Sequence, residues 1–531
     1  MKLALIDRAI IAAYFLVVLV IGFVLRGRIK GSMDFLLSNR RIPLWMTGIS
    51  FMAANLGSLE IMGMVSNGAK YGMLTNHFYW VGAIPAMLFL GLFMVRFYYL
   101  NEVRSVPEYL RHRFDRRCHA LNSLTFAIMT ILMSGINMFA LALVVKSMLG
   151  WSFNFSILVS AGVVVIYTFL GGLTSSIFNE VLQFFLIVAG LLPLTFIGLR
   201  SVGGWSGLRT RLSGELMHTW ATTGTSHNPF GANWLAITLG LGMFLSFGYW
   251  CTDFLLVQRA MAARSLSSAR YTPMVAAVPK MFFPLLVTVP GLIAAATFGP
   301  SLVGHYNDAM PMLLQHFYGP GLLGLGLTAL LASFMSGMAG NVTAFNTVWT
   351  YDLYQTYLRP GKSDQHYLAV ARAATVVGTA LSIATAYIVL RFDNLMDYMQ
   401  LVASFFISPL FATFFLGMFW SRCNATGAFY GMIAGISASG LHYAAFRLGL
   451  LHYTGDMVPN FMGAICGWFG AAVTTVVLSF TQPPPEPRQL EGLTYAHRHR
   501  AGAAPGNTTR GMIVAAVAIL AVTIALNVIF W

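Results

Sequence analysis

Residues 48–64 read GISFMAANLGSLEIMGM, an apolar stretch interrupted at its middle by AANLGS (53–58) and followed closely by Glu60. Asn, Gly and Ser together lower helix propensity, and a carboxylate at mid-membrane depth is costly unless it has a partner. A membrane helix tolerates such a break only where the freed carbonyls face protein, water or an ion. The stretch therefore predicts a binding site within a membrane. The alternative is a kinked packing helix whose small residues allow close approach.

The remaining chain has the composition of a polytopic membrane protein. Hydrophobic residues make up 57% of the 531 residues and charged residues only 9%, whereas about a quarter of a soluble domain is charged. Apolar runs suited to spanning a bilayer, at about 20 residues each, recur along the chain. They lie near 5–25, 45–68, 78–100, 120–149, 154–171, 177–199, 234–257, 273–298, 318–350, 367–391, 397–420, 426–447, 459–480 and 511–530. We therefore expect an all-α membrane protein with about 14 transmembrane helices.

The net charge of +15 reports topology rather than nucleic-acid binding, because the basic residues lie in loops between apolar runs. Arg104, Arg111 and Arg116 follow the third run, and Arg264 follows the seventh. The positive-inside rule places these loops in the cytoplasm and both termini outside. Four cysteines have no metal-like spacing. We expect a multi-pass protein of a cell membrane, the inner membrane of a bacterium.

Several separated sequences resemble the sodium:solute symporter family, in the family's order and over nearly the whole chain. The segment DFLLSNRRIPLW (34–45) is similar to the family's entry segment, and AANLGS resembles its broken first core helix. Further matches are VPEYL (106–110), YTFLGGL (167–173), YWCTD (249–253), DYMQ (397–400) and FWSRCNATGA (419–428).

The resemblance implies a LeuT-type fold, in which two inverted five-helix repeats enclose a site at the membrane midplane. The single transporter domain, 1–531, then divides into an extra N-terminal helix (5–25), a first repeat (43–200), a second repeat (234–420) and three peripheral C-terminal helices within 425–531. The first helix of each repeat is expected to be interrupted, and 247–253 does place a glycine and Asp253 within an apolar run.

The resemblance also implies a sodium site at the first break. Sodium is a hard cation that prefers several oxygen ligands, and a broken helix supplies carbonyls without net charge. The carbonyls of Ala53 and Leu56 would face the ion, together with the carbonyl of Leu330 and the hydroxyl of Ser333. Where the family usually has a second hydroxyl this chain has Phe334, which offers no oxygen. A register in which Ser336 turns toward the ion would make Phe334 a packing residue.

A second cation site is the other position that the resemblance points to. Glu180 matches the position where members with two sodium sites carry Asp, and Ser336 would be its partner on the long helix. The neighbour of Ser336 is Gly337 instead of a second hydroxyl. Glu180 is therefore either part of such a site, a proton carrier, or an acid at the inside end of a helix.

Polar residues on several predicted helices align with the positions that bind solute in the family's sugar carriers. Lys280 and Gln400 match the sugar pattern directly, whereas Tyr79 replaces a glutamate and Glu60 replaces Gln or His. Each can instead snorkel, pair or pack, and it is their convergence from separate helices that favours a site. The predicted solute site is Asn55, Glu60, Tyr79, Tyr249, Trp250, Asp253, Lys280 and Gln400.

These residues predict a secondary transporter that makes and breaks no covalent bond. We expect sodium-coupled symport of a small polar solute, a sugar or a polyol, with no cofactor, with the lipid bilayer as surroundings and with no nucleic-acid partner. The alternatives are a proton-coupled or uncoupled carrier of another small solute, such as an organic acid or amine, and a transporter-like solute sensor. A channel would need a continuous polar path.

Overall fold

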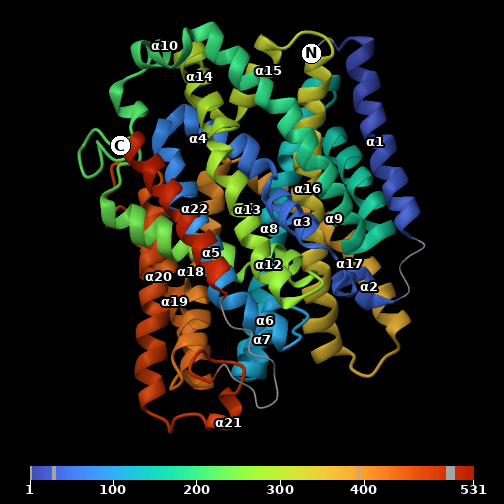
Figure 1. The fold of residues 1–531 in the computed structure, drawn as a ribbon, viewed down its shortest axis with the longest axis vertical. Coiled ribbons are helices and arrows are strands. Elements are labelled where there is room, and N and C mark those ends of the chain that lie inside the picture. The colour runs from blue at the N-terminus through green and yellow to red at the C-terminus, as the bar shows by residue number, and fades with distance from the viewer. Residues whose placement is uncertain (1–2, 27–30, 393, 498–508) are drawn as a thin grey trace.

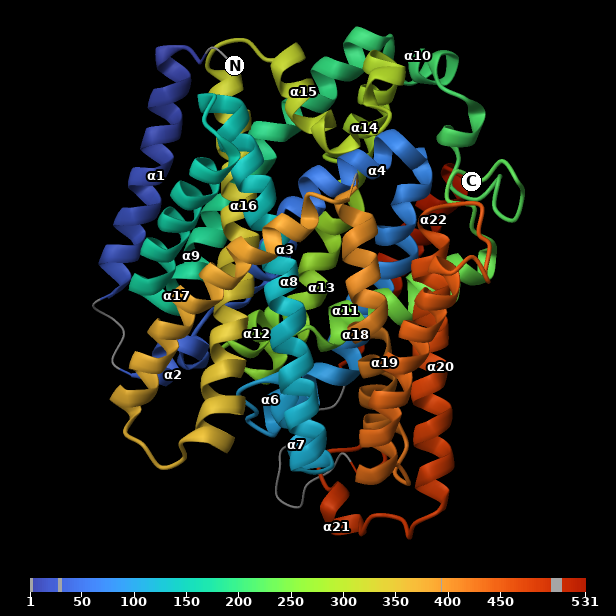
Figure 2. The same cartoon turned by 180° about the vertical axis from the view of Figure 1, so that it is seen from behind.

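The computed structural model describes residues 3–26, 31–392, 394–497 and 509–531. Helices run mainly along the long axis of one bundle, with α3, α8 and α13 near its centre, α1 along one side and α19, α20 and α22 toward the other (Figures 1 and 2). The side chains of Asp34 and of residues 167–172, which carry parts of two family-like sequences, lie outside the described residues.

The elements of the first half are α1 (Leu5–Arg26), α2 (Ser32–Leu37), η1 (Ser38–Arg40), α3 (Leu44–Asn55), η2 (Leu59–Gly63), α4 (Met64–Tyr71), η3 (Gly72–Asn76), η4 (Phe78–Ala83), α5 (Ile84–Phe89), η5 (Leu90–Met94), α6 (Val95–Leu100), α7 (Val106–Arg113), α8 (Arg116–Leu149), α9 (Phe153–Val202), α10 (Gly204–Arg211) and η6 (Gly214–Met217). Those of the second half are η7 (Ala236–Ser246), α11 (Phe247–Thr252), α12 (Phe254–Met261), α13 (Leu266–Phe282), η8 (Phe283–Leu285), α14 (Thr288–Phe298), η9 (Gly299–Leu302), η10 (Tyr306–Asp308), α15 (Ala309–Phe317), α16 (Leu322–Thr347), η11 (Val348–Leu358), α17 (Asp364–Val389), α18 (Leu395–Phe419), α19 (Ala425–Arg447), α20 (Val458–Phe480), α21 (Pro487–Leu490) and α22 (Arg510–Ile529).

The spans agree with the apolar runs of the sequence. Among the described residues, ten helices are long and apolar enough to cross a membrane, and two helix pairs bent at a short break raise the number to twelve. The two remaining predicted spans, 154–171 and 426–447, fall on the first part of α9 and on α19. We expected 154–171 and 177–199 as separate helices, but both lie within α9, which has 50 residues. Its residue Asn154 bonds to Tyr387 of α17, and its residue Thr174 bonds to Ser38 of η1.

Both predicted helix breaks are present. The chain bends by 62° between α3 and the η2–α4 segment, and by 48° between α11 and α12. At the second break Asp253 ends α11 and caps α12, accepting a hydrogen bond from the backbone N–H of Leu255 at 2.8 Å. The long helix also exists, because α16 continues through the π-helical segment η11 to Leu358. The bent helices cross α16 at the centre, where the interruption exposes backbone groups to neighbouring side chains.

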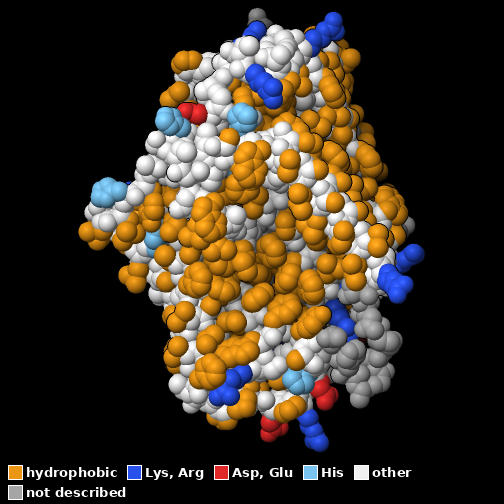
Figure 3. All heavy atoms as spheres, turned by 60° about the vertical axis from the view of Figure 1, so that its left-hand side comes forward, with side chains coloured by type: hydrophobic (Ala, Val, Ile, Leu, Met, Phe, Trp, Pro, Cys, Tyr) orange, Lys and Arg blue, Asp and Glu red, His pale blue; other side chains and the backbone are white. Residues whose placement is uncertain are grey.

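The surface is typical of a membrane protein. Hydrophobic side chains cover the middle of the face in Figure 3, while charged side chains lie mainly toward its two ends.

Trp531 stacks on Trp220, with ring centroids 5.8 Å apart, so the C-terminus lies beside the loop 203–234. At the N-terminus, Asp7 accepts hydrogen bonds from the backbone N–H groups of Gly321 and Gly324 and so caps α16. Figure 1 places both termini toward the end of the bundle that carries α10, in agreement with the expectation that they share one side.

Candidate functional site

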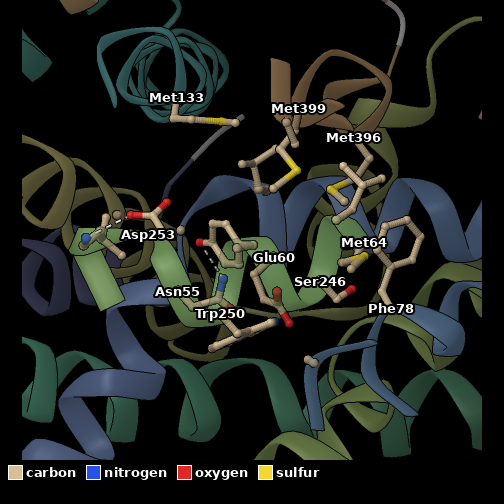
Figure 4. A pocket seen from close by; sticks show the side chains of 18 of the residues that line it. Asn55, Glu60, Met64, Phe78, Met133, Ser246, Trp250, Asp253, Met396 and Met399 are labelled. Carbon is tan, nitrogen blue, oxygen red and sulfur yellow. Dashed lines mark hydrogen bonds between the residues drawn. The ribbon is translucent and has the colours of Figure 1, made fainter. Parts of the chain in front are cut away.

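One cavity at the centre of the bundle collects every residue of the predicted solute site. It lies beside the break after α3 and is lined from α3, η2, α4, η4, α8, η7, α11, α12, α13, α16 and α18. Figure 4 shows Asn55, Glu60 and Trp250 facing this space from the bent helices. The predicted residues that line it are Asn55, Glu60, Tyr79, Tyr249, Trp250, Asp253, Lys280 and Gln400.

A buried ion pair crosses the polar side of the cavity. The ammonium nitrogen of Lys280 lies 2.6 Å from Oε1 of Glu60 and donates to Oδ1 of Asn55 at 2.5 Å. The hydroxyl of Tyr79 donates to the same oxygen of Glu60 at 2.7 Å. Lys280 is only 1% exposed and Glu60 5%, so each charge depends on the other and on these hydrogen bonds. Tyr79 and Glu60 both depart from the sugar-carrier pattern, and the hydrogen bond from Tyr79 holds the carboxylate of Glu60 in place.

The ammonium group of Lys280 also lies over the faces of aromatic rings that line the cavity. The ammonium lies 5.1 Å from the ring centre of Tyr79 and 5.3 Å from that of Trp250, within the range of cation–π attraction. The hydroxyl of Tyr249 accepts from Nδ2 of Asn55 at 3.1 Å. Asn55 therefore joins the break in α3 to both α11 and α13.

The side-chain amide of Gln400 has an oxygen that accepts no hydrogen bond from the described residues. Its Nε2 contacts the sulfur of Met399 at 3.2 Å, and its Oε1 has no hydrogen-bond partner among the described residues although the side chain is buried. A buried amide oxygen without a partner costs free energy, and a ligand hydroxyl in the cavity would supply the missing donor.

Methionines form a part of the lining that sequence reasoning missed. Figure 4 shows Met133, Met396 and Met399 across the cavity from Asn55 and Glu60. Thioether side chains are flexible and adapt to irregular shapes, but methionine in an apolar helix carries no sequence signal of a site. Ser246 and Asn341 also line the cavity and were not predicted.

Three of the four predicted sodium ligands, Ala53, Leu56 and Ser333, lie at the break in α3. The hydroxyl of Ser333 donates to the carbonyl of Leu56 at 2.5 Å, and the hydroxyl of Ser336 donates to the carbonyl of Ala53 at 3.1 Å. Leu330 lies one turn before Ser333 on α16. Two hydroxyls therefore face two carbonyls at the break, that of Leu56 and that of Ala53, which also accepts the backbone N–H of Leu56 at 2.9 Å. One of these hydroxyls, that of Ser336, belongs to a residue assigned by sequence to the second site.

The side chain of Asn137 lies against the same break in α3, and it accounts for the glycine that follows Ser336. Its Oδ1 accepts from the backbone N–H of Ser58 at 2.8 Å and from the Ser58 hydroxyl at 3.0 Å. A Cβ atom on Gly337 would lie 2.6 Å from that oxygen and 2.9 Å from Cα of Gly57. The signal in the sequence was an amide in the middle of the apolar run of α8.

Glu180 does not join Ser336 in the structure. It forms an ion pair with Arg259, whose Nε lies 3.4 Å from Oε2, and it accepts from the hydroxyls of Ser50 and Ser176. Both charged side chains are fully buried. Arg259 already neutralises the carboxylate, so the geometry favours a structural ion pair between α9 and α12 over a second cation or proton site.

Comparisons with known proteins agree with this geometry. A family model described as "Sodium:solute symporter family" matches residues 35–435. The chain is 31% identical over 475 residues to the sodium/glucose cotransporter 2 of Rattus norvegicus, covering 81% of this chain and 70% of the relative. It is 27% identical over 544 residues to the sodium/myo-inositol cotransporter of Canis lupus familiaris, covering 92% and 75%. A solved Na+-coupled sialic acid symporter in a substrate-bound outward-open state has a similar fold, with a TM-score of 0.78 at 20% identity, covering 91% of this chain and all of that one.

Proposed function

The chain belongs to the sodium:solute symporter family, and from this membership we propose that it moves a sugar or polyol across the membrane together with sodium. It is a multi-pass membrane transporter and not an enzyme. We place it in a bacterial inner membrane, with the repeats at 43–200 and 234–420 as the moving parts. Relatives named for glucose and myo-inositol transport support the choice of a neutral, hydroxyl-rich solute.

The observation that carries the proposal is the meeting of two hydroxyls with two carbonyls beside a polar cavity. The hydroxyls of Ser333 and Ser336 donate to the carbonyls of Leu56 and Ala53 at the break in α3. These four groups are the ones that would hold a sodium ion, with the hydroxyl and carbonyl oxygens as its ligands. All four oxygens are neutral, as suits a site that must release its ion.

Coupling between ion and solute follows from the position of Asn55. It lies in the same turn as Ala53 and Leu56, and its side chain bonds to Lys280 and Tyr249 in the cavity. A change in the break therefore moves a group that contacts the solute space. Each ligand then stabilises the arrangement that the other binds, which is the requirement for thermodynamic coupling.

The polar side chains suit hydroxyl recognition. Lys280 donates, Glu60 accepts, the free oxygen of Gln400 accepts, and the ring of Trp250 offers a flat apolar face. The Lys280–Glu60 pair carries no net charge, so it does not favour a carboxylate solute.

Uptake by proteoliposomes tests the proposal. Purified protein should accumulate a labelled hexose or inositol when an inward sodium gradient is imposed, and potassium in place of sodium should abolish accumulation. A panel that includes amino acids, carboxylates and amines identifies the solute class. Accumulation driven by a proton gradient in the absence of sodium would overturn the sodium assignment.

A further inference from the structure

A second hollow, separate from the central cavity, lies at the opposite end of the bundle from the termini. It has a volume of about 590 Å³ and is formed where α7 and the start of α8 meet the end of η11 and the following loop. Its size lies within the range of small-molecule sites. It is lined by Arg104, Arg111, Arg116, Gln355, Thr356, Pro360 and Gly361.

The hollow has more positive than negative charge. Glu108 is the carboxylate that pairs with its arginines, and it is shared: Oε1 lies 3.2 Å from Arg104 and 3.4 Å from Arg111. Burial acts to raise the pKa of Glu108, but the two arginines and the backbone N–H of Arg104 outweigh it and hold that pKa below its ordinary value. Glu108 is therefore ionised, and its negative charge is already paired with Arg104 and Arg111.

Arg116 adds a charge that no carboxylate among the described residues balances. Its guanidinium reaches the carbonyl of Thr356 at 3.4 Å and lies 5.3 Å from the ring centre of Tyr357. The nearest acid in sequence, Asp115, is engaged by Arg117 at 2.9 Å and by the backbone N–H of Cys118. Two of the three guanidinium groups thus share the carboxylate of Glu108, and the third, that of Arg116, has no ion pair with a carboxylate among the described residues.

Arg104 is also held in place before any ligand arrives. It lies 4.6 Å from the ring centre of Tyr351 and donates to Oε1 of Gln355 at 3.1 Å. Preorganised donors lose less conformational entropy on binding, and the planar fork of arginine matches the oxygens of a phosphate group.

We infer that this hollow binds a phosphate-bearing anion through Arg104, Arg111 and Arg116. The phosphate belongs either to a soluble phosphorylated metabolite or to the head group of an anionic lipid. Bound there, it joins α7 and α8 to η11, the continuation of the helix that carries Ser333 and Ser336. His119 lies behind the hollow and bonds to Asp352 and Tyr357, so the same two helices are already connected at this point.

Calorimetry on the full chain in nanodiscs tests the inference, with pyrophosphate as the soluble probe. In phosphatidylcholine discs the parent should bind pyrophosphate, and Arg111→Gln and Arg116→Gln should each weaken binding about tenfold or more, because each loses a charge-assisted hydrogen bond. Arg117→Gln is the matched control: it removes the same charge one residue away, from a side chain that points to Asp115. Solute uptake by each variant without pyrophosphate establishes that it is folded.

Discs containing phosphatidylglycerol separate the two sources. If the head group occupies the hollow, pyrophosphate should bind the parent more weakly in these discs than in phosphatidylcholine discs. If the ligand is soluble, the lipid should make no difference. The inference is overturned if the parent does not bind pyrophosphate at millimolar concentration, or if Arg117→Gln weakens binding as much as Arg111→Gln, since the charges then serve only membrane topology.

Discussion

The ammonium nitrogen of Lys280 lies 2.6 Å from a carboxylate oxygen of Glu60, and this pair joins α13 to the π-helical turn η2 just after the break in α3. Neither group has appreciable contact with solvent. The pair therefore has two roles, because it presents donors and acceptors to the cavity and also connects α13 to η2.

Breaking this pair from one side should destabilise the protein. Lys280→Met leaves the carboxylate of Glu60 buried without its counter-charge, and the expected loss is about 3 to 5 kcal/mol of unfolding free energy. The double variant Glu60→Met/Lys280→Met should recover most of that loss while remaining inactive in uptake. Unfolding in mixed micelles measures both. A double variant as unstable as Lys280→Met would show that packing, and not charge compensation, is what the pair supplies.

Gln400→Ala should weaken solute binding without reducing stability. The amide oxygen of Gln400 has no partner among the described residues, so its removal deprives only the solute of a hydrogen bond. The expected cost is about 1 to 3 kcal/mol, or about 5- to 150-fold in affinity. Ser404→Ala is the control, since that hydroxyl lies one turn along α18 and bonds to its own helix. Equal affinities for parent and Gln400→Ala would place the solute elsewhere.

Ser333→Ala and Ser336→Ala should both weaken activation by sodium. Each removes one hydroxyl from the corner at Ala53 and Leu56, and each should raise the sodium concentration for half-maximal uptake by about 5- to 150-fold at fixed pH. The structure thus favours the register in which Ser336 faces the break.

Phe334→Ser distinguishes the two registers. Phe334 is fully buried in the hydrophobic core, so its replacement should leave a cavity and cost about 3 to 5 kcal/mol of stability without tightening sodium activation. Tighter activation in this variant would instead place residue 334 at the ion.

Single cysteines test the orientation in the membrane. Ser226→Cys and Ser267→Cys are both on exposed residues, and maleimide should label the first only from outside and the second only from inside. Cys466 is the native cysteine with partial exposure and should first be changed to Ser. Ser32 is unsuitable, because it is buried and bonds to Tyr351 and Asp364. Labelling of positions 226 and 267 from one side contradicts the predicted topology.

The sequence was sufficient for the fold because each span had to be apolar over a bilayer's thickness, and because the breaks at AANLGS and at Asp253 use residues that are costly in a membrane helix. The resemblance to the family's sugar carriers, and not composition or spacing, pointed to the polar lining, whose eight predicted members meet in one cavity. The sequence could not give the ion pair of Glu180 with Arg259, because their separation in sequence carries no sign of contact. It could not assign Ser336 either, since Ser333 and Ser336 both carry hydroxyls on α16 and the sequence does not show which of them faces the break.

The close contact between Gly57 and Gly337 limits which substitutions the chain can accept beside Ser333 and Ser336. Asn137 occupies the space into which a side chain at 337 would extend. A serine at 337 would add a hydroxyl next to Ser336, yet as a first step it would collide with Asn137, and shrinking Asn137 first would leave Ser58 without its acceptor. A smaller residue at 137 does not remove the clash, because a Cβ at 337 would still lie 2.9 Å from the Cα of Gly57. The space beside Ser333 and Ser336 is therefore closed to a third hydroxyl at 337 unless the backbone at Gly57 moves as well.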